Sequence, residues 1–202
     1  MNPNRSAWKR AALTLVLAAA AALLLGCGLF VDRSVSELTF EADQKIDIAD
    51  LQKYDNLTKL DLRACDVSAE LYDELHAALP NCTIVWNVPL GGSLFDSQIT
   101  QITLPKVDGE ELTMLDYFPN LASVDATACD CYGALMSKSL ERQDIAFSWN
   151  VPIGGVTASN SDTTLDLNGA TTGGVDTLAA ALSYLPTLTS VEIRGGDVAG
   201  TD

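Results

Sequence analysis

The chain has 202 residues, 48% of them apolar, and carries 12 Lys and Arg against 27 Asp and Glu, a formal net charge of −15. This apolar content excludes overall disorder, and the length predicts one domain plus a targeting segment. Arg5, Lys9 and Arg10 lie in an N-terminal stretch without acids, so the remainder has 9 basic and 27 acidic residues, a formal −18. Such a surface repels phosphate backbones, and we therefore expect no nucleic-acid partner.

The N-terminus has the pattern of a secretory signal. A basic stretch, MNPNRSAWKR, precedes an uncharged run from Ala11 to Val31 that contains Leu24-Leu25-Gly26-Cys27. This tetrad resembles the lipobox of bacterial lipoproteins. The resemblance implies a signal peptide at residues 1–26, cleavage before Cys27 and lipidation of Cys27, with residues 27–37 as a tether.

An uncleaved signal anchor is the alternative for this segment. Residues 11–31 form an uncharged run of 21 residues, long enough to span a bilayer, and the apolar Leu29-Phe30-Val31 after Cys27 favours that alternative. Both interpretations place residues 32 onward on the extracytoplasmic face of the cell membrane, lipid-anchored or single-pass anchored.

Beyond the tether the sequence resembles itself at a spacing of about 64 residues. The most specific match is between WNVPLGG at 86–92 and WNVPIGG at 149–155. This predicts long periods at about 38–101 and 102–164, and an incomplete one at 165–202.

An eleven-residue frame also recurs, at Leu57–Val67, Leu121–Cys131 and Leu188–Val198. Its first copy, LTKLDLRACDV, resembles the leucine-rich repeat signature L-x-x-L-x-L-x-x-N/C-x-L. The resemblance implies an α/β fold over residues 38–202, a short solenoid with a parallel β-sheet on its concave side and helices on its convex side. Because leucine-rich repeats mostly serve as protein-binding scaffolds, it also implies a protein ligand.

Short alternating segments predict strands. They are centred near Phe40, Asp61, Val85, Thr103, Asp125, Ser148, Asp166 and Glu192. Apolar spacing predicts helices through Leu71–Leu79 and Leu178–Leu185, and another after a capping box formed by Asp108 and Glu111. We expect 91–101 to form a small hairpin with the strand that follows, and 154–164 to be an exposed loop.

The cysteines and tryptophans are expected to be structural. Cys65 and Cys129 occupy the N/C position of the frame, where a small polar group donates to a carbonyl of the turn. Cys129-x-Cys131 has neither a second cysteine pair nor a histidine beside it, so no metal site is predicted. Trp86 and Trp149 fall on the buried side of their strands, and the alternative for them is stacking on a sugar.

The candidate site is the outer row of the predicted sheet, because alternate side chains of a strand point away from the core. Four of its eight strands contribute a carboxylate, so the row is a candidate acidic binding face, and a merely solvated face is the alternative. The candidate partner-binding residues are Asp61, Asp125, Asp166, Glu192, Thr39 and Thr103.

No catalytic motif occurs in the sequence, and its only histidine, His76, has no predicted partner. We therefore expect no enzyme, no catalytic residues and no cofactor. The predicted function is a membrane-anchored extracytoplasmic protein that binds an unidentified protein or peptide through its sheet face. The alternatives are a cell-wall or carbohydrate-binding surface lipoprotein that uses the tryptophans, and the repeat portion of a longer protein.

The sequence stops at Asp202, just after the last predicted strand and at a point where the earlier periods have a helix. An uncapped end of a solenoid exposes its core, so we expect the isolated chain to be marginally stable or to self-associate through that end.

Overall fold

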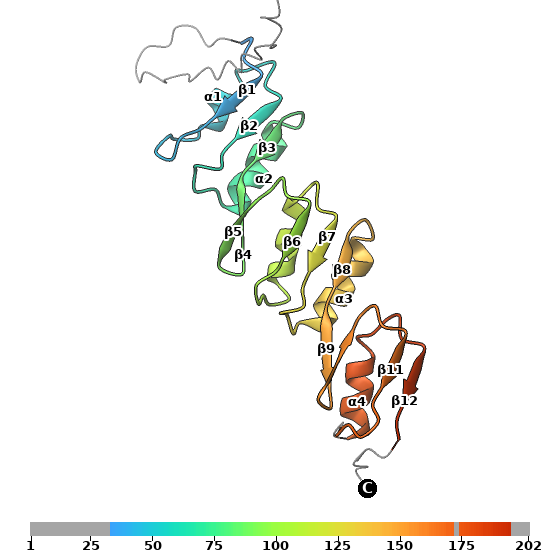
Figure 1. Cartoon of the computed structure of the whole chain (residues 1–202). Helices are drawn as coiled ribbons and strands as arrows, with labels where there is room; N and C mark the ends of the chain where they lie inside the picture. The colour runs from blue at the N-terminus through green and yellow to red at the C-terminus, as the bar shows by residue number, and fades with distance from the viewer. Residues whose placement is uncertain (1–32, 172–173, 195–202) are drawn as a thin grey trace, which may run out of the picture.

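The computed structural model describes residues 33–171 and 174–194, and these form an elongated α/β molecule (Figure 1). The elements, in chain order, are β1 (Glu37–Thr39), α1 (Ile48–Leu51), β2 (Lys59–Asp61), α2 (Ala69–Ala78), β3 (Thr83–Val85), β4 (Asn87–Leu90), β5 (Ser93–Asp96), β6 (Gln101–Thr103), the 3₁₀ helix η1 (Glu111–Tyr117), β7 (Ser123–Asp125), α3 (Tyr132–Glu141), β8 (Ala146–Ser148), β9 (Asn150–Ile153), β10 (Val156–Ser159), β11 (Thr164–Asp166), α4 (Val175–Leu182) and β12 (Ser190–Glu192).

The predicted solenoid is wrong. Within residues 33–171 and 174–194 the strands form several small separate sheets instead of one continuous parallel sheet. Three are parallel (β1-β2-β3, β6-β7-β8 and β11-β12), and two are antiparallel hairpins (β4-β5 and β9-β10). The physical reason is that the chain leaves each three-stranded sheet at Trp86 or Trp149 and turns back on itself, so a hairpin interrupts the ladder.

The parallel strands are short because a polar turn follows them closely. In β2 the buried Leu60 lies between Leu38 of β1 and Ile84 of β3. Asp61 then accepts a hydrogen bond from the backbone N–H of Arg63, two residues later (3.2 Å). Such a local bond from an aspartate stabilises a turn and ends the strand.

The same turn closes two further strands. Asp125 accepts from the N–H of Thr127 (3.0 Å), and Asp166 accepts from the N–H of Asn168 (2.9 Å). These aspartates therefore have a structural role in the backbone before any role in binding is considered.

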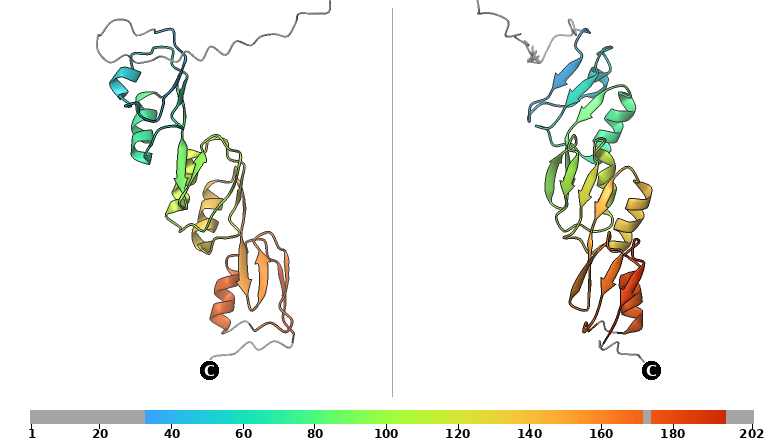
Figure 2. Two further views of the ribbon diagram at one scale, coloured as in Figure 1. Left: turned by 60° about the vertical axis from the view of Figure 1, so that its left-hand side comes forward. Right: turned by 45° about the vertical axis from the view of Figure 1, so that its right-hand side comes forward.

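The helices lie along one side of the parallel sheets (Figure 2). The predicted α2 is confirmed, with Ser68 as its N-cap and Leu75 fully buried, and the predicted α4 buries Leu178. The capping box is also confirmed, because Asp108 accepts from the N–H of Glu111 (2.9 Å) and Glu111 accepts from the N–H of Asp108 (3.1 Å). The helix that it begins is 3₁₀ in geometry, and neither α1 nor α3 was predicted.

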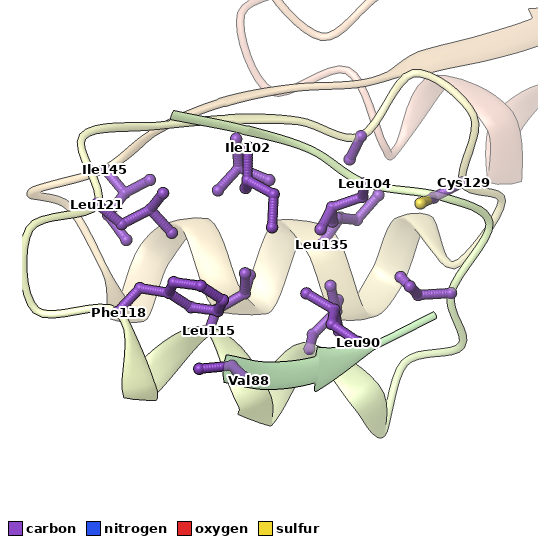
Figure 3. Close-up of a cluster of buried hydrophobic side chains, with 14 of the residues drawn as sticks. Val88, Leu90, Ile102, Leu104, Leu115, Phe118, Leu121, Cys129, Leu135 and Ile145 are labelled. Carbon is purple, nitrogen blue, oxygen red and sulfur yellow. The ribbon is translucent and has the colours of Figure 1, made fainter. Parts of the chain in front are cut away.

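The first hairpin packs against the helix that follows it. Val88 and Leu90 of β4 lie beside Leu115 of η1 and Phe118, and all four are buried (Figure 3). The backbone N–H of Gly91 donates to the Glu111 carboxylate (3.0 Å). The hairpin therefore connects the first parallel sheet to the core of the second.

The second hairpin occupies the corresponding place, with β9 against α4. It shows that the loop predicted for 154–164 is wrong, because this stretch contains β10 and the start of β11. The hairpin suggested within 91–101 does form, but β5 pairs with the preceding β4 and not with a strand that follows.

Glycine pairs make both hairpin turns. Gly91, Gly92, Gly154 and Gly155 have φ values of 56°, 73°, 58° and 88°, which are the left-handed conformations that a two-residue hairpin turn of type I′ requires. Gly91 has a further constraint, since a Cβ there would lie 2.3 Å from the Pro105 side chain.

The tryptophans are core residues, as predicted. Trp86 and Trp149 are 0% and 1% exposed, so stacking on a sugar is wrong for both in this structure. The indole N–H of Trp149 donates to the carbonyl of Tyr184 (3.0 Å), whereas the indole N–H of Trp86 is buried without a partner in the described chain. Trp86 instead stacks on Tyr72, with ring centroids 5.1 Å apart.

Candidate binding face

The outer positions of the strands align in register, but in three separate rows. Pairing places Thr39 beside Asp61 and Val85, Thr103 beside Asp125 and Ser148, and Asp166 beside Glu192. The predicted alternation is thus reproduced in the second and third sheets, whereas in the first sheet Asp61 and Val85 are buried. A single row of four carboxylates does not exist, because no sheet in the described chain contains more than two of them.

The first row is not an open acidic face. Asp61 is only 9% exposed, and its carboxylate receives hydrogen bonds from the Arg63 guanidinium at 2.5 and 3.0 Å. The hydrogen bond from Arg63 holds the pKa of Asp61 below its ordinary value, against the opposing effect of burial. Arg63 also donates to Asp96 of β5 (2.9 Å), and thereby ties the first sheet to its hairpin.

Val85, at the end of the first row, is also inaccessible. It is 3% exposed, although the alternation predicts an outward side chain. Thr39, at the other end, is exposed. The first row therefore offers a partner little more than Thr39.

The third row is exposed and acidic. Asp166 and Glu192 lie side by side in the register, and neither has a cationic partner within the described residues. Two adjacent like charges repel one another, and such a pair attracts cations. Among the described residues, the N–H of Asn168 is the one polar group that fixes a carboxylate of this row.

The middle row lies in a hollow. An open cavity of about 610 Å³ covers the sheet β6-β7-β8. It is lined by Gln101, Ile102, Thr103, Ser123, Val124, Asp125, Ala146, Phe147 and Ser148.

Asp125 is the charged group of this hollow. One carboxylate oxygen is fixed by the N–H and the hydroxyl of Thr127, at 3.0 and 2.8 Å. The other oxygen has no protein partner in the part of the chain that the structure describes. Two hydroxyls, of Thr103 and Ser148, flank Asp125 in the register. The hollow therefore presents an oriented, uncompensated negative charge between neutral hydrogen-bonding groups.

One sequence signal could have separated the rows. The residue two positions after the aspartate is Arg63 in the first sheet, Thr127 in the second and Asn168 in the third. A cation at that position forms an ion pair with the aspartate, whereas a hydroxyl or an amide leaves the negative charge of the aspartate unpaired. The burial of Val85 and the hollow itself have no comparable signal in the sequence.

Cys65 and Cys129 make the predicted hydrogen bonds to backbone carbonyls. The thiol of Cys65 donates to the carbonyl of Glu41 (3.5 Å), and the thiol of Cys129 donates to the carbonyl of Pro105 (3.3 Å). Burial raises the pKa of Cys65 and of Cys131, which favours the unreactive thiol form. Within the described residues no cluster of three His, Cys, Asp or Glu side chains could hold a metal ion.

His76 lies on the exposed face of α2 and stacks on Tyr72, with centroids 5.9 Å apart. It does not line the hollow described above, and its ring contact places it in an aromatic cluster.

Cys27 and the signal segment lie outside the described residues. In the described ranges, no helix has the length and apolarity needed to cross a membrane. Comparison with protein-family models finds no match, and the comparisons with curated proteins and with solved structures find none either. The likeness to leucine-rich repeats is thus one of short sequence frames, and the fold that it implied is not observed.

Proposed function

We propose that the chain is a non-catalytic binding protein, held on the extracytoplasmic face of the membrane, that takes a cationic segment of a protein or peptide partner on the sheet β6-β7-β8. The observation that carries this proposal is the hollow over that sheet, with Asp125 as its uncompensated charge. Of the predicted site residues, Thr103 and Asp125 belong to this surface.

The chemistry of the hollow fits a lysine or arginine side chain. An ammonium or guanidinium group can donate to the free oxygen of Asp125, and hydrogen bonds of this charge-assisted kind are among the strong ones. The hydroxyl of Thr103 can accept or donate beside it, whereas the hydroxyl of Ser148 already donates to the carbonyl of Val124 (3.4 Å) and can accept. The net charge of −15 over the whole chain adds a long-range attraction that speeds the encounter with a cationic partner.

The test is binding of short peptides that differ only in charge. We expect the full chain to bind peptides with a central lysine or arginine and to reject the same peptides with glutamate there. Asp125→Asn keeps the shape of the side chain and its bonds to Thr127 but removes the charge. It should weaken binding by about tenfold to a hundredfold, since a hydrogen bond to a charged group contributes roughly 1.5–3 kcal/mol.

Two matched variants control for the change in net charge. Asp61→Asn and Asp166→Asn remove one charge from the other two sheets and should leave peptide affinity within about twofold. Equal losses in all three variants would mean that only the overall charge matters, and an unaffected Asp125→Asn would contradict the proposed site.

The anchor is tested separately from the ligand. If Cys27 is lipidated, metabolic labelling with palmitate should mark the protein, and Cys27→Ala should remove the label. A protein that stays in the membrane but takes up no label in either form would point to the single-pass anchor instead.

The tryptophan-based carbohydrate alternative has no support in this geometry. Both tryptophans are buried, so neither offers a ring face on which a sugar could stack.

A further inference from the structure

The first sheet holds a cation of its own at the place where the second sheet has its hollow. The guanidinium of Arg63 lies on the carboxylate of Asp61, with Nε donating to Oδ1 (3.0 Å) and Nη2 donating to Oδ2 (2.5 Å). The remaining nitrogen, Nη1, donates to Asp96 of β5 (2.9 Å). Two carboxylates thus supply an acceptor for every nitrogen of the planar group, which is the two-pronged binding that suits a guanidinium.

The second sheet keeps the aspartate of this arrangement, as Asp125, and replaces the other two residues. Thr127 stands two positions after the aspartate. The hairpin position of the second carboxylate, opposite the asparagine that begins β4 or β9, holds Ser159. Neither replacement is charged, so the sheet supplies Asp125 with no cation from the first position and with no helping carboxylate from the second.

Thr127 also occupies one oxygen of the aspartate. Its hydroxyl donates to Oδ1 of Asp125 at 2.8 Å, and its backbone N–H donates to the same oxygen at 3.0 Å. In the first sheet the corresponding oxygen accepts the backbone N–H and the Nε of Arg63. The threonine hydroxyl therefore has the place that Nε has in the first sheet. Among the described residues only Oδ2 of Asp125 is left without a partner.

One available carboxylate oxygen suits an ammonium group better than a guanidinium. The donors of a guanidinium form a rigid planar fork, and its second prong would meet an oxygen that already accepts two hydrogen bonds. An ammonium is a compact charge whose three donors need no common plane. Thr103 and Ser148 flank Asp125 in the register, and their hydroxyl oxygens can accept the donors that Oδ2 does not take.

We propose that the hollow over β6-β7-β8 selects the primary ammonium of a lysine side chain over the guanidinium of an arginine, and that Thr127 sets this preference. The inference rests on the proposed function, because it specifies which cationic side chain that site takes. Without the hydroxyl, Oδ1 of Asp125 becomes available to the second prong of a guanidinium. With an arginine in place of Thr127, the chain fills the site itself, as Arg63 does in the first sheet.

The test compares three peptides that differ only at a central residue, which is lysine, arginine or Nε-acetyl-lysine. Each peptide has a blocked N-terminus, so that the lysine side chain is its only primary amine. We expect the full chain to bind the lysine peptide about 2- to 10-fold more tightly than the arginine peptide, which is the effect of one hydrogen bond. The acetylated peptide has lost the charge and should bind at least about tenfold more weakly than the lysine peptide.

Variants at Thr127, whose side chain is exposed, separate its hydroxyl from its shape. Thr127→Val removes the hydroxyl at nearly constant shape and should remove the preference for lysine or reverse it. Thr127→Ser keeps the hydroxyl and should keep the preference. Both retain the backbone N–H that fixes Asp125, so the turn is preserved.

Thr127→Arg should weaken the binding of both the lysine and the arginine peptide by about tenfold or more, because its own guanidinium takes Oδ2 of Asp125. The matched control is Asn168→Arg, which adds the same charge at the same position of the turn in the third sheet. It should leave both affinities within about twofold. Equal losses in the two arginine variants would overturn the internal occupation of Asp125.

The outcomes separate this inference from the function on which it rests. If lysine and arginine peptides bind equally to the wild-type chain, or if Thr127→Val leaves their ratio unchanged, the selectivity is wrong. The cationic site would survive that result as long as Asp125→Asn weakens both peptides. If no cationic peptide binds, or if Asp125→Asn has no effect, the proposed function fails and the selectivity fails with it.

Discussion

Three aspartates with the same backbone role differ in charge environment, and the difference comes from one neighbouring residue. Asp61, Asp125 and Asp166 each accept the N–H two residues later. Only Asp61 is followed by an arginine at that position, and only Asp61 is buried. The same turn therefore contains an ion-paired aspartate in the first sheet and, among the described residues, an aspartate without a cationic partner in the second.

The Asp61–Arg63 pair predicts a pH dependence of stability. Because the folded state holds the pKa of Asp61 below its ordinary value of 3.8, the pair stabilises the fold above that pH. The contribution is lost as the pH falls through the lowered pKa. Asp61→Asn should cost about 1 kcal/mol at pH 7, a modest value because the arginine side chain is 47% exposed, and should flatten the fall in stability below pH 4.

Denaturant unfolding at pH 7, 4 and 3 measures this effect. Asp166→Asn removes an exposed aspartate of the same turn that has no cation beside it, so its stability should follow that of the wild type across the three pH values. An Asp61→Asn curve parallel to the wild-type curve would contradict the prediction.

The secondary structure follows from the sequence where the periodicity is undisturbed. All eight strands predicted by alternation form, since each has an apolar centre between two outer residues. α2 and α4 form because their leucines share one face. α1 escapes prediction because it has only four residues, and α3 begins at Tyr132-Gly133 without a side-chain cap.

The alternation of apolar and polar residues does not predict the hairpins. Ile84, Trp86 and Val88 keep a period of two, although the chain passes from one sheet to another at Trp86. Alternation shows which side of a strand is buried but not which strand lies beside it. The stronger signal was Gly91-Gly92, because a glycine pair is what a two-residue hairpin turn requires.

The candidate site was predictable only in part for the same reason. The outward phase of Asp125 and Thr103 follows from alternation, whereas their grouping in one hollow depends on which strands pair. The wrong solenoid came from extending one ladder across Trp86 and Trp149, where the ladder ends.

Across the whole molecule, the parallel sheets follow one another along its length and share no strand (Figure 1). Apolar packing contributes to both connections, through β4 on η1 at the first joint and β9 on α4 at the second. Each joint has a buried valine at the same place in the N-V-P sequence, Val88 and Val151, at 0% and 2% exposure. The two valines therefore allow the joints to be weakened separately.

We expect Val88→Ala and Val151→Ala each to cost about 1–3 kcal/mol, because each removes buried methyl groups and leaves a cavity. Hydrogen exchange should locate the loss. Val88→Ala should lower the protection of amides in η1, around Leu115, and Val151→Ala should lower it in α4, around Leu178. If each variant instead lowered protection equally from β1 to β12, the sheets would unfold as one cooperative unit. That result would contradict the prediction that the two joints can be weakened separately.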